Sequence, residues 1–139
     1  MTDPHDLGRF VLAQDDIYHA AVSELRAGRK RSHWMWFVFP QIAGLGRSAT
    51  AQRYALASRA EAEAYLAHPV LGPRLLECTR ILLELPDVSA VEVLGAVDAQ
   101  KLRSSMTLFA GAAPDEPLFR DVLTRYFDGE QDEETLRRL

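Results

Sequence analysis

The chain has 139 residues, of which 47% are hydrophobic and 26% charged, and its formal net charge is -4. A chain of this length suits one domain with a sizeable core, and the composition excludes an intrinsically disordered protein. The acidic balance argues against general nucleic-acid binding, which normally requires a basic domain.

Apolar side chains recur at helical spacing from Leu7 to Leu25, and Gly28 is placed to end that stretch. Asp15 and Asp16 interrupt the apolar pattern, and either carboxylate could cap a new helix. The sequence therefore predicts a short first helix followed by a second one.

The continuous apolar run 34–39 fits either a buried helical turn or a short strand. We favour a short helix, because Ser32 is a suitable cap before the run and Pro40 a stop after it. Residues 41–48, with sequence QIAGLGRS, form a glycine-bearing loop.

Further helices with capped or proline-bounded ends are expected beyond this loop. They cover 49–57, a run from Ser58 to His68-Pro69, 70–85 before Pro86, 89–94 before Gly95, 99–109 after Asp98, 118–127, and a terminal stretch after Asp132. Because no useful strand alternation occurs, the fold class is all-α: a single compact domain of about seven short to medium helices over 1–139. The expected buried side chains are Phe10, Val11, Leu25, Phe37, Leu66, Leu75, Cys78, Leu82, Leu108 and Phe109.

The single cysteine, Cys78, excludes an intrachain disulfide and fits a reducing compartment. The first ten residues lack the basic and apolar pattern of a secretion signal, and no apolar run approaches the ~20 residues that span a bilayer. We therefore expect a cytoplasmic protein without a membrane segment.

Four segments resemble a known family: LGRFVLAQ, GRKRSHWMWFVFPQIAGLGRSATAQRYAL, EAEAYLAHPVLGPRLLECTRILL and DAQKLRSSMTLFA. They are similar to the bacterial and fungal "domain of unknown function 1810" family from about Asp6 to Leu136. The resemblance implies one all-helical domain, and it implies no activity and no functional residue. Members are sometimes labelled calpastatin, but calpastatin inhibits through extended disordered repeats, which this repeat-free chain lacks.

A shorter stretch, AHPVLGPRLLECTRILLEL with the glycine-containing turn after it, resembles the NADAR family. That family is linked to NAD and ADP-ribose metabolism. The resemblance implies hydrolysis of a ligand of that type.

A basic-aromatic segment, residues 29–41, is the densest polar and aromatic cluster of the sequence. Trp34 and Trp36 would point about 200° apart on a helix, so one indole should pack in the core and the other face a cleft beside His33. An aromatic face near cationic side chains suits a purine base with its phosphate. The alternative is that both indoles are core, His33 bonds a backbone carbonyl, and the cations are a solvated helix end.

Three other positions could add to a site. Gly44 to Ser48 could present backbone N–H groups to an anion, or simply be a turn capped by Ser48. Arg74 and Lys101 are expected to be exposed cations that matter more to a ligand than to stability. Ser104 lies one helical turn after Lys101, which suggests a polar lining rather than a lysine-activated nucleophile.

Two function classes remain open. The first is a domain that binds a nucleotide-like or phosphorylated small anion, and hydrolyses it if it is an enzyme, with His33 as the proton-transfer group. Its ligand-binding residues would be Arg29, Lys30, Trp34, Trp36, Gln41, Ser48, Arg74, Lys101 and Ser104. The second is a non-catalytic protein-interaction module, for which the basic first half and acidic last quarter would allow homo-oligomers. The scattered histidines predict neither a metal site nor a cofactor.

Overall fold

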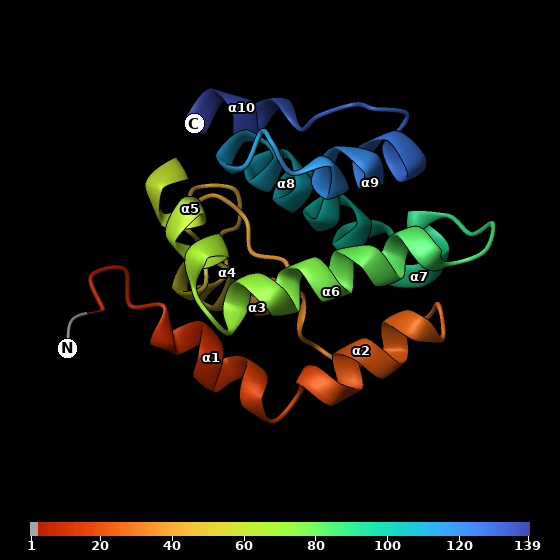
Figure 1. Ribbon diagram of the computed structural model, residues 1–139, viewed down its shortest axis with the longest axis horizontal. Coiled ribbons are helices and arrows are strands. Elements are labelled where there is room, and N and C mark those ends of the chain that lie inside the picture. The colour runs from red at the N-terminus through yellow and green to blue at the C-terminus, as the bar shows by residue number, and fades with distance from the viewer. Residues whose placement is uncertain (1–2) are drawn as a thin grey trace.

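The structure, a computed structural model, describes residues 3–139 and folds them into ten helices (Figure 1). The helices are α1 Gly8–Asp15, α2 Tyr18–Arg26, α3 Met35–Val38, α4 Ala49–Arg53, α5 Arg59–Ala67, α6 Leu71–Glu84, α7 Ala90–Leu94, α8 Ala96–Ala112, α9 Pro117–Phe127 and α10 Glu133–Arg138. Within this described range there is no strand, only one isolated parallel bridge between Ile42 and Leu56. The all-α single-domain prediction is confirmed, although the helices are more numerous than expected.

Two long helices, α6 and α8, organise the packing. Helix α6 contacts α2, α5 and α9, and Figure 1 shows it running between α2 and α9. Its buried residues Leu71, Leu75, Cys78 and Leu82 recur every three or four positions, so they share one face. Helix α8 contacts α5, α7, α9 and α10, and it lies at the other side of the same core. The core therefore sits between α6 and α8.

The predicted core is largely correct. Phe10, Leu25, Leu75, Cys78, Leu82, Leu108 and Phe109 are buried. Val11, Phe37 and Leu66 are half-buried and pack against this core. Apolar spacing thus located the inward faces of α1, α2, α6 and α8.

Several helix ends differ from the prediction: α8 ends at Ala112 rather than Phe109, and neither Asp15 nor Asp16 caps α2. Helix α4 ends at Arg53 because the next residues pair with the glycine loop: the Leu56 N–H donates to the Gln41 carbonyl at 2.9 Å. Helix α8 begins at Ala96, directly after Gly95, whose φ of 86° ends α7. Asp98 therefore lies inside the first turn of α8 and is not its cap. Ser32 does not cap α3 either, since its hydroxyl bonds to a carboxylate of α2.

Arginine side chains bind the free carbonyls at several helix ends. At the end of α6, Arg125 donates to the carbonyls of Leu82 at 3.0 Å, Leu83 at 2.6 Å and Pro86 at 2.6 Å, and also to that of Leu85. At the end of α8, Arg59 donates to the Gly111 carbonyl at 2.6 Å. The last carbonyls of a helix have no partner within it, so a guanidinium satisfies several at once.

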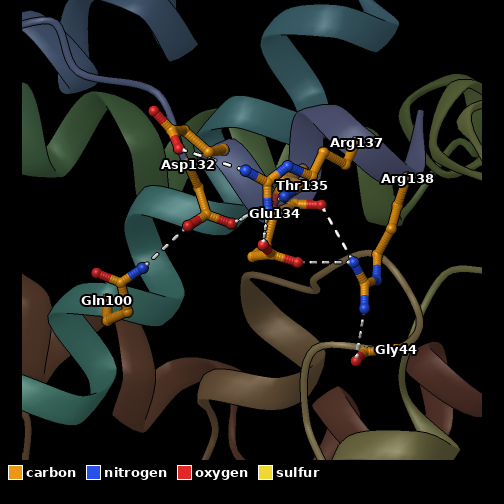
Figure 2. Close-up of polar contacts among 8 residues, drawn as sticks. Gly44, Gln100, Asp132, Glu134, Thr135, Arg137 and Arg138 are labelled. Atoms are coloured by element: carbon orange, nitrogen blue, oxygen red, sulfur yellow. Dashed lines mark hydrogen bonds and ion pairs between the residues drawn. The ribbon is translucent and has the colours of Figure 1, made fainter.

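Helix α10 closes the fold against α8 and the glycine loop (Figure 2). Asp132 caps it by accepting from the Thr135 N–H at 3.0 Å, as the sequence predicts, and Gln100 of α8 donates to Asp132 at 3.1 Å. Arg138 donates to Glu134 at 3.0 Å and to the Gly44 carbonyl at 3.4 Å. A Cβ at Gly44 would lie 2.7 Å from the Arg138 Nε, so glycine allows this close approach.

Candidate functional site

The basic-aromatic segment connects α2 to the loop after α3, and Glu24 fixes its first part. One Glu24 oxygen accepts from the backbone N–H groups of Arg31 and Ser32, at 2.7 and 2.8 Å, and from the Trp34 indole at 3.0 Å. The other accepts from the Ser32 hydroxyl at 2.6 Å. A single carboxylate thus orders four donors of a stretch that forms no helix of its own.

These hydrogen bonds determine the charge of Glu24. Burial raises the pKa of this carboxyl, but the bonds from Ser32, Arg31 and Trp34 outweigh burial and lower the pKa to about 2. Glu24 is therefore ionised at neutral pH. The sequence prediction missed it, although an acid in the last turn of a helix opposes the helix dipole and could have marked it.

The last part of the segment is held by a buried polar network. The Phe37 carbonyl accepts from the Gln14 amide at 2.6 Å and from the Tyr65 hydroxyl at 3.2 Å. Arg74 donates to the other end of the Gln14 amide at 3.2 Å, which fixes the orientation of that amide. Burial raises the pKa of Tyr65, so its hydroxyl remains a donor. Helix α3 is consequently fixed at both ends.

Two lysines, one from the basic-aromatic segment and one from α8, share one carboxylate. The Lys30 Nζ lies 2.8 Å from one oxygen of Asp98, and the Lys101 Nζ lies 3.4 Å from the other. Lys30 also lies over the Trp34 ring, 5.3 Å from its centroid, and Lys101 over the Trp36 ring at 4.6 Å. Lys101 is the cation next to Trp36, and it shares its carboxylate partner with Lys30. We call Lys30, Trp36, Asp98 and Lys101 the lysine–indole cluster.

Comparisons with known proteins establish the family. Residues 4–139 match the family described as "Protein of unknown function (DUF1810)". The chain belongs to this family. It is also similar to the conserved hypothetical protein Rv1873 from Mycobacterium tuberculosis, whose crystal structure has a TM-score of 0.97 and 52% sequence identity over 99% of this chain and 98% of that chain. No curated protein gives a significant match.

Family membership confirms the resemblance seen in the sequence. Because the family has no assigned function, the chemistry of the site has to be inferred from its geometry. The structure brings four of the predicted site residues together: Lys30, Trp34, Trp36 and Lys101. Trp34 is fully buried, whereas Trp36 is half-buried, so the two indoles do face different surroundings. His33 and Arg29 are exposed at the start of the segment.

Three other predicted site residues form hydrogen bonds that belong to local structure. The Gln41 backbone pairs with Leu56, and Ser48 caps α4 by accepting from Ala51 at 3.1 Å. Ser104 is buried and donates to the Gln100 carbonyl of its own helix at 3.2 Å. None of these hydrogen bonds involves a residue of the lysine–indole cluster.

The expectation that Arg74 and Lys101 are free, exposed cations is wrong. Arg74 lies 3.7 Å from Asp15, bonds to Gln14 and stacks over Tyr18 at 4.7 Å. The Lys101 side chain is 20% exposed. Arg74 pairs with a carboxylate from another helix, which sequence spacing does not reveal, whereas Lys101 pairs with Asp98 of its own helix at i,i+3 spacing. Both residues therefore contribute to structure as well as charge.

Metal and thiol chemistry find no support in the part of the chain that is described. Among residues 3–139, no three His, Cys, Asp or Glu side chains gather as metal ligands would. Burial raises the pKa of the Cys78 thiol to about 12, so Cys78 stays protonated and is no nucleophile. None of the described helices has the length and apolar character of a membrane span.

Proposed function

We propose that this protein binds a phosphorylated, nucleotide-like small molecule at the lysine–indole cluster. The observation that carries this assignment is the sharing of Asp98 by Lys30 and Lys101 beside a half-buried indole. An anion arriving there meets two ammonium groups that share the Asp98 carboxylate, next to low-dielectric aromatic surface that strengthens the attraction. The exposed Arg29 adds a further cation to the approach.

The geometry limits how such a ligand could bind. Lys101 already covers one face of Trp36, so a purine stacked on that face would have to displace the ammonium group. We therefore expect the phosphate to meet Lys101 and Lys30 first, and the base to pack at the edge of the indole. Both lysines would then move away from Asp98 towards the ligand.

If the domain is an enzyme, His33 is the side chain suited to exchange a proton with that ligand. It is exposed and lies in the chain directly between the Glu24-bound Ser32 and the buried Trp34, so its backbone is held in place. The NADAR resemblance suggests hydrolysis of an NAD or ADP-ribose-type molecule. The free, buried Cys78 suits a reducing compartment, and we place the protein in the cytoplasm.

A thermal-shift screen with nucleotides, ADP-ribose and sugar phosphates tests this function. A ligand at 100 times its Kd adds roughly 2.7 kcal/mol to stability, which raises the melting temperature measurably. We expect the shift to become smaller in Lys101→Met and to stay unchanged in Arg47→Met, which removes an exposed cation elsewhere. No stabilising ligand, or equal losses in both variants, would contradict the assignment.

A second function class, protein–protein interaction, is favoured by two exposed apolar side chains, one in α7 and one at the start of α8. Val97 is 71% and Val91 56% exposed. Such side chains on a soluble surface can mark an interface, including one between two copies of the chain. Sedimentation velocity with the wild type and a Val91→Ser, Val97→Ser variant separates ligand binding from protein–protein interaction. Concentration-dependent association of the wild type that this variant abolishes would favour a protein-interaction module.

A further inference from the structure

An open groove lies between α1 and α4, away from the lysine–indole cluster. Its volume is about 530 Å³, within the range of small-molecule sites. The residues that line it are Asp6, Gly8, Arg9, Leu12, Ala13, Arg53 and Tyr54. None of them is a residue that the sequence predicts for a site.

Arg9 forms a rigid cationic part of this groove. Its guanidinium donates to four backbone carbonyls, those of His5 at 2.7 Å, Asp6 at 2.8 Å, Arg53 at 2.8 Å and Ala55 at 3.0 Å. No carboxylate of residues 3–139 lies within ion-pair distance of it. Carbonyl dipoles orient Arg9 but do not cancel its unit charge.

Arg53 adds a second, more accessible cation. It is exposed, its guanidinium carbon lies 5.5 Å from the Tyr54 ring centroid, and no described carboxylate pairs with it. The Asp3 carboxylate lies beside the groove, where it accepts from the Gly8 N–H at 2.9 Å, so Asp3 and the lining Asp6 offset the charge of Arg9. Arg53 is the guanidinium that remains available to a ligand, and guanidinium is the side-chain group best matched to carboxylate and phosphate oxygens.

The apolar part of the groove is equally well placed. The Tyr54 ring is fixed by a tilted contact with Phe10, at 5.8 Å between centroids, and an edge contact with Phe37 at 5.3 Å. Leu12 stands beside it, mostly exposed, so apolar surface is available next to the cations. Charge and apolar surface occur together, as in sites for amphipathic small molecules.

We propose that the α1–α4 groove binds a small organic anion, with its carboxylate or phosphate at Arg53 and its ring or chain against Leu12 and Tyr54. This second site is independent of the lysine–indole cluster. Phenyl phosphate and benzoate are suitable probes, because they combine an aromatic ring with the two anionic groups. Inorganic phosphate and benzyl alcohol carry only one of the two features.

Backbone amide NMR titrations of the whole chain test the groove. Phenyl phosphate or benzoate should shift residues 6–13 and 53–54 saturably, and more tightly than inorganic phosphate or benzyl alcohol do. The tighter of the two ring-bearing anions identifies the preferred anionic group. Arg53→Gln should weaken this binding about tenfold, as expected for loss of one charge-assisted contact.

Two control variants make the outcome decisive. Arg47→Gln removes an exposed arginine outside the groove and should leave the affinity unchanged, and so should Lys101→Met in the lysine–indole cluster. Equal weakening by Arg47→Gln, equal binding of inorganic phosphate, or no shift in the groove residues would overturn this site. Because Lys101→Met removes only the other site, failure of one assignment is distinguishable from failure of the other.

Discussion

Two regions of the molecule use positive charge in opposite ways. At the end of α6, the Arg125 guanidinium donates to four backbone carbonyls, those of Leu82, Leu83, Leu85 and Pro86. At the lysine–indole cluster, Lys30 and Lys101 share the one carboxylate of Asp98. The arginine completes the backbone hydrogen bonding of a helix, whereas we propose that the lysines keep their charge for a ligand.

The chemistry of the two cations explains this division. Guanidinium is a planar fork with five donors, so it can satisfy several fixed carbonyls together. Ammonium is a compact charge on a flexible stem, and it can move from Asp98 to an incoming anion at little cost in backbone structure. If this comparison is right, stability should depend strongly on the arginine and ligand affinity on the lysines.

The largest expected effect comes from Arg125→Lys. A lysine keeps the charge but cannot reach four carbonyls, so we expect the free energy of unfolding to fall by about 3 kcal/mol, because several bonds to a charged donor are lost. Urea denaturation measures this. Arg120→Lys, at an exposed position of the same helix, should change stability by less than about 0.5 kcal/mol. Similar effects in both variants would mean that the carbonyl contacts add nothing.

A smaller, pH-dependent effect is expected for Glu24→Gln. The folded-state pKa of about 2 lies below the ordinary value of 4.5, so ionised Glu24 stabilises the native state above pH 4.5, and this stabilisation is lost as the pH falls towards 2. At pH 7 the variant should be less stable by about 2 kcal/mol, since bonds to a charged acceptor are replaced. Urea denaturation at several pH values should show the two proteins converging in acid. A difference that is constant with pH would show that the charge of Glu24 is not involved.

Sequence reasoning succeeded where the physics is local. Apolar spacing located α6, and the caps Ser48, Ser58 and Asp132 were correct because a cap involves only neighbouring residues. The sequence predicted only part of the lysine–indole cluster. Asp98 and Lys101 have the i,i+3 spacing of one helix, but Lys30 reaches Asp98 from a separate segment, and no spacing along the chain encodes that second contact. Asp98 was mistaken for a cap because α8 begins before it, at Ala96.

The same limit applies to the anchors of the segment. Gln14 reaches the Phe37 carbonyl from α1, and Glu24 binds a loop that has no regular pattern. Both residues form polar contacts with chain segments that are distant in sequence or have no regular secondary structure. The sequence shows that the aromatic and basic residues lie in one segment. Only the fold shows which of their side chains are buried or hydrogen-bonded and which are exposed.

The smallest stability effects are expected at the two lysines. Lys30→Met or Lys101→Met keeps most of the aliphatic stem, and Asp98 retains one partner, so each should cost about 1 kcal/mol or less. The double variant leaves Asp98, whose side chain is only 17% exposed, without either cation. In a double-mutant cycle, the stability lost by the double variant should therefore exceed the sum of the stabilities lost by the two single variants. Strict additivity would show that the lysines do not share the carboxylate in solution.

A titration of tryptophan fluorescence with ADP-ribose tests the central claim most directly. Wild-type emission should change saturably, because a bound phosphate draws Lys101 away from the Trp36 ring. The response should vanish in Trp36→Phe, which leaves only the buried Trp34 to report, and its midpoint should rise at least about tenfold in Lys101→Met. A saturable response that survives in Trp36→Phe, or that Lys101→Met leaves unchanged, would contradict ligand binding at the lysine–indole cluster.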